Sequence, residues 1–242
     1  DHTGCLIRIL EEISNSQKLQ LYIHPDAFCE RFFNRNKENT KRKLLGKTRK
    51  EIKNLEGIFY PQRFDYDSIY KYIKKENLHL TNTTTEIFPN VYITGQIPRI
   101  NKIEMISGFY RWKSFEKEKL TEKDEILDDQ AVFIDLGENN GLLIILGCTH
   151  SGLLNTINFI KKQFDKKISC IIGGMHLVNA GEKRINETIT YLKNLQIENP
   201  KLIIVPLHCS GIKFKDKLKL ELKNVYDLGV GTKLSFQSLS QI

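Results

Sequence analysis

Three histidines share one place in the sequence pattern, directly after a predicted strand and before a predicted helix. They are His150, His176 and His208, and each has a glycine or a cysteine within two residues. Because the carboxyl ends of strands in an α/β sheet gather ligands at one edge, three imidazoles there can converge on one divalent metal ion. Any one of them alone would more often be a hydrogen-bonded polar residue, but the repeated placement favours a metal site.

The segments that would position these histidines alternate between strand and helix patterns. Apolar, β-branched runs at 130–136 and 141–147 are separated by Gly137-Glu-Asn-Asn140, which is typical of a hairpin. Apolar residues at helical spacing predict a helix over 151–164. The other predicted strands are 21–23, 91–94, 169–173 and 202–207, and the other predicted helices are 5–13, 26–35, 65–75, 182–195 and 211–222. This alternation predicts an α/β layered fold.

Composition narrows the class of protein. The chain has 242 residues, 40% hydrophobic residues and a net charge of +8, which indicates a globular domain and excludes a collagen, a coiled coil or a disordered tail. No run of eighteen apolar residues and no signal segment is present, so neither a membrane span nor secretion is expected. The odd number of cysteines, five without a CxxC pair, is typical of a reducing compartment. We therefore expect a cytoplasmic protein.

The chain opens with Asp1-His2-Thr3-Gly4, which resembles the second half of the His-x-His-x-Asp-His signature of the metallo-β-lactamase fold. Six later blocks occur in the order found in one branch of that superfamily. This branch contains the 7,8-dihydropterin-6-methyl-4-(β-D-ribofuranosyl)aminobenzene-5′-phosphate synthases of methanopterin biosynthesis and their relatives. The blocks are His24-Pro25-Asp26-Ala27-Phe28, Thr94-Gly95-Gln96-Ile97-Pro98-Arg99, Asp128-Asp129-Gln130-Ala131, Gly147-Cys148-Thr149-His150-Ser151-Gly152, Gly173-Gly174-Met175-His176-Leu177 and Pro206-Leu207-His208-Cys209-Ser210-Gly211.

The resemblance implies a four-layer αββα sandwich with a metal site on one edge. The two histidines that precede the Asp-His pair in the signature are absent here, so we expect a sandwich that lacks its first strands. We expect one domain over residues 1–242, with a basic helical insertion at about 30–85. Nine Lys and Arg residues against two acidic ones between Asn34 and Lys53 mark this insertion.

The resemblance also implies roles for single residues. Asp1, His2 and His208 would serve one metal ion, and His150 would serve the other. Cys148 stands where many members of the superfamily have a metal-bridging aspartate, although a packed structural cysteine is the alternative. Two divalent ions are expected, zinc first, with manganese or iron also compatible. Asp1 and His176 are the catalytic candidates, and His176 could instead contact the substrate or bind metal.

Two reaction classes fit this ligand set. Paired metal ions can stabilise a leaving pyrophosphate, as a transferase joining a dihydropterin pyrophosphate to a ribofuranosyl aminobenzene phosphate would require. They can also activate water for a metal-dependent hydrolase of the phosphodiesterase, nuclease or lactamase type. Arg99 follows a predicted strand and could bind a substrate phosphate. Trp112, with Phe109 and Tyr110, could stack on a pterin ring, but core packing is the favoured interpretation.

A non-enzymatic role stays open, because a chain without half of its metal motif could be an inactive truncated remnant or a binding module. The preferred partner is a small phosphate-bearing substrate, and a homo-oligomer is compatible with the sequence. The charge of +8 over 242 residues is modest for a nucleic-acid-binding surface. Basic and aromatic residues do not interleave as strand-binding surfaces require, so nucleic acid is not favoured.

Overall fold

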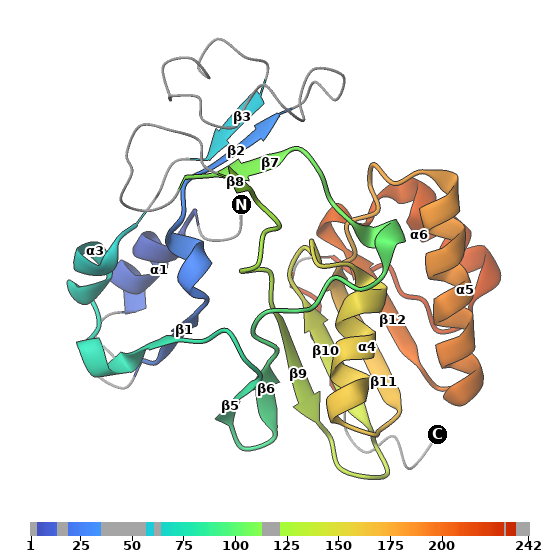
Figure 1. Ribbon diagram of the computed structural model, residues 1–242. Coiled ribbons are helices and arrows are strands. Elements are labelled where there is room, and N and C mark those ends of the chain that lie inside the picture. Colours follow the sequence, from blue (N-terminus) through green and yellow to red (C-terminus); the bar gives the residue numbers. More distant parts are fainter. Residues whose placement is uncertain are drawn as a thin grey trace. The chain divides into compact units, whose positions relative to one another are not determined.

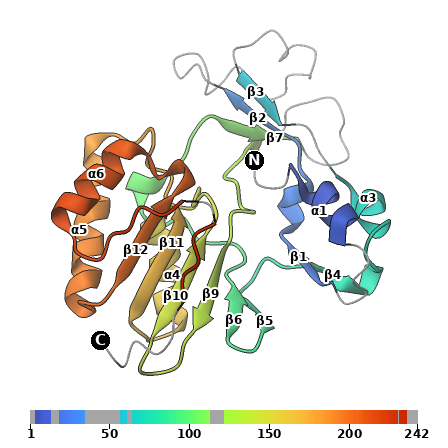
Figure 2. The same ribbon diagram turned by 180° about the vertical axis from the view of Figure 1, so that it is seen from behind.

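The computed structural model describes residues 4–13, 19–34, 57–60, 64–112, 122–229 and 231–235 (Figures 1 and 2). The chain divides into two units, Asp1–Asn82 with Ile106–Asp128, and Thr83–Met105 with Asp129–Ile242. The second unit contains the three histidines predicted at strand ends. Asp1 and His2, and residues 35–56 of the predicted basic insertion, lie outside the described residues.

A six-stranded sheet in the order β12-β11-β10-β9-β6-β5 forms the centre of the second unit. Its strands are β5 (Thr85–Phe88), β6 (Val91–Ile93), β9 (Ala131–Asp135), β10 (Leu142–Leu146), β11 (Ile168–Gly174) and β12 (Ile203–Leu207). β10, β11 and β12 are parallel to one another, whereas β9, β6 and β5 add antiparallel pairs. The carboxyl ends of the three parallel strands therefore lie at one edge of the sheet.

The predicted hairpin between 130–136 and 141–147 is confirmed. β9 and β10 pair in antiparallel register from Leu142 opposite Asp135 to Leu146 opposite Ala131. Gly137 and Gly141 have φ values of +88° and +71°, which glycine adopts without steric cost. The Gly141 N–H donates to the Gly137 carbonyl at 2.9 Å and closes the turn.

Three helices pack against this sheet: α4 (Leu153–Gln163), α5 (Glu182–Glu198) and α6 (Ile212–Glu221). In Figures 1 and 2, α4 lies across one face of the parallel strands. Side chains alternate along β10, so that Ile144 is fully buried in the helix-covered core while Ile145 is 39% exposed. Ile157 of α4, Ile189 of α5 and Phe214 of α6 join Ile144 in that core. The predicted α/β fold class is confirmed.

A buried carboxylate holds the amino-terminus of α4. Glu104 ends the short 3-10 helix Lys102–Glu104 and accepts hydrogen bonds from the backbone N–H groups of Leu154 at 2.9 Å and Asn155 at 2.8 Å. Its burial raises the pKa of this carboxyl, an effect that the two N–H donors and Arg184 oppose. Gly152, the residue before the helix, has a φ of +97° and no room for a Cβ beside Glu104.

The first unit builds one small core from its helices and a two-stranded parallel sheet. The elements are α1 (Leu6–Ile13), β1 (Leu21–Ile23), the 3-10 helix Pro25–Phe28, α3 (Tyr66–Tyr70), the 3-10 helix Lys75–Asn77 and β4 (Leu78–Leu80). Leu10, Ile23 and Ile69 are buried together in this cluster. The helix predicted over 65–75 is real but ends at Tyr70, because a Tyr72 to Ile69 hydrogen bond closes the chain into a tight turn there.

A second sheet in this unit has the order β3-β2-β7-β8, with β2 (Arg31–Asn34), β3 (Gly57–Tyr60), β7 (Phe109–Arg111) and β8 (Glu122–Lys123). The prediction of a helix over 26–35 was wrong, since its second half is strand β2. Phe32 and Asn34 are buried while Arg31 and Phe33 are less so, which is the two-residue period of a strand. Phe32 packs with Tyr110 and Trp112, which agrees with core packing for these aromatic residues.

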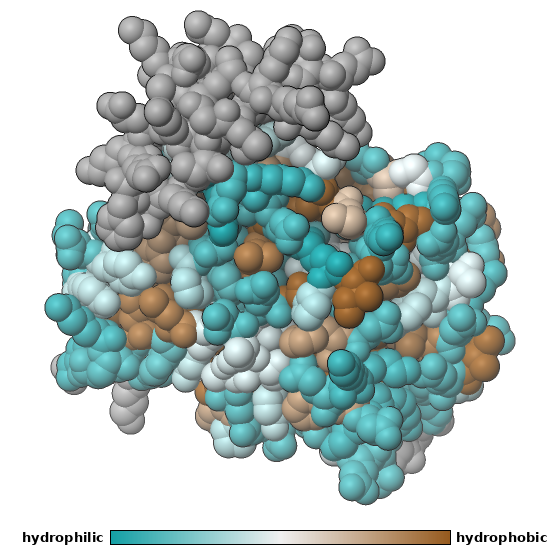
Figure 3. Space-filling model, in the orientation of Figure 1, coloured by the Kyte–Doolittle hydropathy of each residue, from teal (hydrophilic) through white to brown (hydrophobic). Residues whose placement is uncertain are grey.

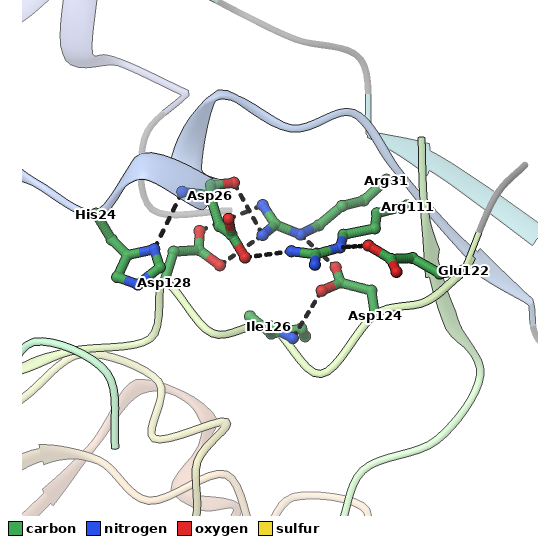
Figure 4. Close-up of polar contacts among 8 residues, drawn as sticks. All are labelled: His24, Asp26, Arg31, Arg111, Glu122, Asp124, Ile126 and Asp128. Atoms are coloured by element: carbon green, nitrogen blue, oxygen red, sulfur yellow. Dashed lines mark hydrogen bonds and ion pairs between the residues drawn. The ribbon is translucent and has the colours of Figure 1, made fainter. Parts of the chain in front are cut away.

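Buried ion pairs tie β2 to the segment that follows β8 (Figure 4). The Arg31 guanidinium pairs with Asp124 and donates to both carboxylate oxygens of Asp128, at 2.6 and 3.2 Å. It also donates to the backbone carbonyl of Asp26 at 3.0 Å. The side chain of Arg31 is 13% exposed and that of Asp124 is fully buried, so removal of Arg31 would leave the buried Asp124 carboxylate without this ion pair.

Arg111 extends this network along β7. Its guanidinium pairs with Asp26 and donates to Glu122 of β8 at 2.7 Å. Two of the sequence blocks that resemble the synthase branch, the one beginning at His24 and the one beginning at Asp128, thus meet in the same network (Figure 4). In the described structure these residues fix strand positions in the first unit.

His24 borders the network and is 4% exposed. Its Nδ1 accepts from the Asp26 N–H at 3.0 Å, and its Nε2 has no hydrogen-bond partner among the described residues. Burial lowers the pKa of His24 below its ordinary value of 6.5, although Asp26 and Asp128 oppose the effect. The folded protein therefore holds this imidazole neutral.

Among the described residues, no helix has the length and apolar character needed to cross a bilayer. Figure 3 shows a face on which hydrophilic residues predominate and hydrophobic ones form small patches.

We expect acid to weaken the folded state through His24. As the pH falls below about 6.5, His24 binds a proton in the unfolded chain but not yet in the folded protein, where it is buried. The free energy of unfolding therefore declines by at most about 1.4 kcal/mol per pH unit. His24→Asn, which keeps an acceptor for the Asp26 N–H, should flatten this slope in urea titrations between pH 5 and 8. His79→Asn on β4, at a side chain that hydrogen-bonds Gln20 near the surface, is the control. Equal slopes for wild type and His24→Asn would contradict the expectation.

Gly152→Ala should destabilise the protein by about 2–3 kcal/mol, because it adds a steric clash with Glu104 to a strained backbone. Gly137→Ala is the matched control, since Gly137 also has a positive φ but a Cβ added there would meet no heavy atom within 4 Å. Chemical denaturation should show the smaller loss for Gly137→Ala, and equal losses would exclude the clash.

Candidate metal centre

The three parallel strands of the second unit each end in a turn with a left-handed, non-glycine residue. Thr149 after β10 has a φ of +61°, His176 after β11 has +48°, and His208 after β12 has +46°. Such conformations are uncommon outside glycine and cost of order 1 kcal/mol or more each. Backbone strain of this kind concentrates at binding and catalytic sites, and here it coincides with two of the predicted histidines.

The turns after β10 and β12 have the same construction. Each places a buried serine before a glycine of positive φ, and each glycine precedes a helix: Ser151-Gly152 before α4 and Ser210-Gly211 before α6. The residue directly before the serine is His150 in one turn and Cys209 in the other. Cys209 therefore takes the place in its turn that His150 takes in the first.

Three side chains meet where these turns converge. One ligand atom each from Cys148, His176 and Cys209 lies within 4.8 Å of the other two. Zinc binds thiolate sulfur at about 2.3 Å and imidazole nitrogen at about 2.0–2.1 Å, so tetrahedral ligand atoms stand about 3.5–4 Å apart. The cluster is close to that spacing, and its donor types are those that zinc prefers.

The two sulfurs interact, and the interaction moves their pKa values in opposite directions. Hydrogen bonds from the Cys148 thiol and from the ring and backbone of His176 lower the pKa of Cys209 well below its ordinary value. The same bond to Cys209, together with burial, raises the pKa of Cys148. Cys170, on β11 but away from such donors, has its pKa raised to about 12 by burial alone. Of the two sulfurs, Cys209 is thus the one whose deprotonated form, the form that binds metals, is favoured.

The imidazoles of His150 and His176 lie next to one another, with ring centroids 4.3 Å apart. The Nδ1 of His176 is buried and has no hydrogen-bond partner among the described residues. A buried nitrogen without a partner costs free energy that a bound cation or a substrate donor would recover, so these residues fit a metal ion.

Three contacts hold the turn that carries His150. Arg99 donates from Nη1 to the backbone carbonyl of His150, and Asp129 accepts from the Ser151 N–H at 2.8 Å. Thr149 donates its hydroxyl to the carbonyl of Gly174 in the neighbouring turn. Arg99 thus positions the turn, and its predicted contact with a substrate phosphate stays a prediction.

The structure places some of the predicted metal ligands in the cluster and others outside it or outside the described residues. Asp1 and His2 lie outside the described residues, so their metal-binding and catalytic roles stay predictions. Cys148 and His176 belong to the three-residue cluster, and His150 adjoins it through its ring. His208 is not one of the three clustered ligands in the part of the chain that the structure describes, and its role stays a prediction.

Cys209 was missed as a site residue by reasoning from the sequence. The signal was present in the repeated Ser-Gly pair, which places Cys209 opposite His150 when the two turns are aligned. The nearby His208 drew the assignment instead, because imidazole is the commoner ligand.

Gly174→Ala should disturb this centre. A Cβ at Gly174 would lie 2.5 Å from the carbonyl oxygen of Gly147 and 2.9 Å from the Sγ of Cys209. We expect a loss of about 1–3 kcal/mol in unfolding free energy from overpacking. In Gly147→Ala, the matched control, the nearest atom is 3.8 Å away, so denaturation should show a smaller loss. Similar stability of the two variants would show that the strand ends are loosely packed.

The chain is similar in sequence to two archaeal proteins. No family model matches the chain. It is 27% identical over 231 residues to the 7,8-dihydropterin-6-methyl-4-(β-D-ribofuranosyl)-aminobenzene-5′-phosphate synthase of Methanocaldococcus jannaschii, covering 94% of this chain and 68% of that protein. It is 30% identical over 148 residues to the uncharacterized protein MJ0448 of the same organism, covering 60% of this chain and 50% of that protein.

A solved structure matches the fold. The crystal structure of Tm1679, a metal-dependent hydrolase of the β-lactamase superfamily, superposes with a TM-score of 0.67 at 19% identity, covering 90% of this chain and 72% of that one. The predicted resemblance is confirmed: the chain has the fold of the metallo-β-lactamase superfamily and is a relative of the dihydropterin ribofuranosylaminobenzene phosphate synthase.

Proposed function

We propose that this chain is a metal-dependent enzyme that acts on a small phosphate- or pyrophosphate-bearing substrate at the carboxyl edge of β10, β11 and β12. The observation that carries the proposal is the convergence of Cys148, His176 and Cys209, beside His150, at that edge. The similarity to a synthase along 94% of the chain supports the substrate class.

The proposed metal ligands are Asp1, His2, His150, His208 and Cys148, with two divalent ions and zinc as the preferred metal. Such ions would supply Lewis acidity toward phosphoryl oxygens. The residues of the chain would orient the substrate and transfer protons to it. His176 interacts with Cys209, and its Nδ1 has no hydrogen-bond partner among the described residues, so it can hold a proton for a leaving group or contact the substrate.

Arg99 can take part in substrate binding in addition to holding the His150 turn. A guanidinium has five N–H donors in a planar fork, so its bond to the His150 carbonyl leaves donors for a phosphate oxygen. Asp1, a proposed metal ligand, is also the second catalytic candidate.

A metal-dependent hydrolase is the second candidate. It is favoured by the fold, which matches a protein described as a metal-dependent hydrolase. The same ligands would serve either reaction, because stabilising a leaving pyrophosphate and activating water both need a cation at this edge. The substrate distinguishes the two.

His176→Gln should reduce kcat/KM by at least about 100-fold, since a positioned acid or base contributes roughly that much. The purified chain would be tested with added zinc, manganese or iron(II) against the two pterin-pathway substrates and against a generic phosphodiester. His79→Gln, in the first unit, is the control and should retain activity.

Activity toward the pterin substrates alone would support the synthase, and activity toward the phosphodiester alone would support the hydrolase. A chain that binds no added metal and turns over neither substrate would contradict the proposal and favour an inactive remnant or a binding module.

A further inference from the structure

We propose that Cys209, Cys148 and His176 together bind a thiophilic divalent cation, so that this edge of the sheet carries a Cys2His centre. The inference deepens the proposed function and rests on the same site, but it assigns Cys209 and His176 as ligands and predicts the chemical class of the metal.

The three donor atoms are already placed for a shared ligand. They come from three turns at the same sheet edge and lie within 4.8 Å of one another without an ion present. Residues next to the two cysteines are held tightly, since Thr149 bonds to the Gly174 carbonyl and Ser210 donates to the Leu207 carbonyl at 2.6 Å. Donors held by such turns need little rearrangement to bind a cation.

Cys209 and His150 occupy equivalent positions in their turns. Both residues precede a buried serine and a glycine of positive φ, and both follow a parallel strand of the same sheet. The fold thus places two side chains at matching positions of turns on the same edge, one an imidazole and one a thiol. Both side-chain types ligate zinc.

The absence of a side chain at Gly174 leaves room for the sulfur of Cys209. A Cβ at Gly174 would approach the Sγ of Cys209 to 2.9 Å and the carbonyl of Gly147 to 2.5 Å. The Cys209 Sγ also lies 3.4 Å from the Cys148 carbonyl oxygen. The sulfur is therefore positioned by close neighbours on two other turns, and its side chain is half-buried and not sealed in the apolar core.

Three protein ligands leave one coordination position of a tetrahedral cation open. Catalytic zinc centres keep such a position for water or substrate, and two cysteines with one histidine form one of the known ligand sets. His150, with its ring 4.3 Å from that of His176, is the nearest described candidate for a fourth ligand. Either arrangement keeps the centre beside the proposed substrate.

Sulfur ligands predict which metals bind. Thiolates prefer zinc, cadmium and cobalt(II) over manganese and magnesium, which prefer oxygen donors. Without a cation, Cys148 and Cys209 would be only a hydrogen-bonded pair of packed thiols, and that is the alternative that an experiment must exclude.

The test is a titration of the reduced, metal-free full chain with cobalt(II), followed by absorption spectroscopy. A cobalt–thiolate centre gives a charge-transfer band in the near ultraviolet that imidazole and carboxylate ligands alone do not give. We expect the wild type to show this band. Added zinc should displace the cobalt ion and remove the band, whereas added manganese should not. Cys209→Ser should abolish or strongly weaken it and reduce zinc affinity by at least about 100-fold, since even outer-shell changes cost 10–100-fold.

Cys148→Ser should also weaken the band, and Cys5→Ser, at an exposed thiol of the first unit, is the matched control that should leave it unchanged. Circular dichroism would confirm that each variant is folded. If buried Cys148→Ser fails to fold, half-buried Cys209→Ser still decides the question.

The outcomes separate this inference from the proposed function. Cobalt binding without a thiolate band, or a band that Cys209→Ser leaves intact, overturns the Cys2His centre even if the chain is a metal-dependent enzyme. A band lost in Cys209→Ser supports the centre even if neither substrate class is turned over. Absence of any cobalt binding overturns the inference outright.

Discussion

The candidate centre depends on one constraint, the parallel pairing of β10, β11 and β12. Their register aligns Ile145 with Ile172 and Ile172 with Val205. The clustered ligands Cys148, His176 and Cys209 lie three, four and four residues beyond that row. Because strand residues advance by about 3.3 Å each, side chains at nearly equal distances past one row must emerge at nearly equal heights. Residues separated by up to 61 positions in sequence thus become neighbours because their strands pair.

The turns at the ends of these strands are strained, and interactions elsewhere in the second unit offset the free energy of that strain. Thr149, His176 and His208 adopt left-handed backbone conformations, each disfavoured for residues with a Cβ. The buried hydroxyl of Ser210, the carboxylate of Asp129 and the guanidinium of Arg99 bond to these turns. Beneath them lies a core of fully buried aliphatic and aromatic side chains. A large core can sustain a strained edge, and preorganised donors need less reordering when they bind.

The sequence predicted the second unit well because its signals are periodic and strong. Buried parallel strands are continuous apolar runs, and their crossover helices repeat apolar residues at helical spacing. The first unit was harder, because β2 at Arg31–Asn34 has only four residues and derives its stability from Phe32 packing on distant Tyr110 and Trp112. Glu104 and Cys209 were missed for a related reason: their roles arise from partners 50 and 61 positions away, at Leu154 and Cys148.

Electrostatics connects the sulfur ligands to the substrate. Each thiolate cancels one positive charge of a bound divalent cation, so a centre with two sulfurs would be close to neutral. Such a centre would attract a phosphate less strongly than a centre with three neutral imidazoles. The attraction for an anionic substrate would then have to come from fixed cations such as Arg99, which reaches the His150 turn. The chain is similar in sequence to a synthase and has the fold of a metal-dependent hydrolase. Under the proposed Cys2His centre, the balance between sulfur and imidazole ligands at this edge would set the charge that meets the substrate.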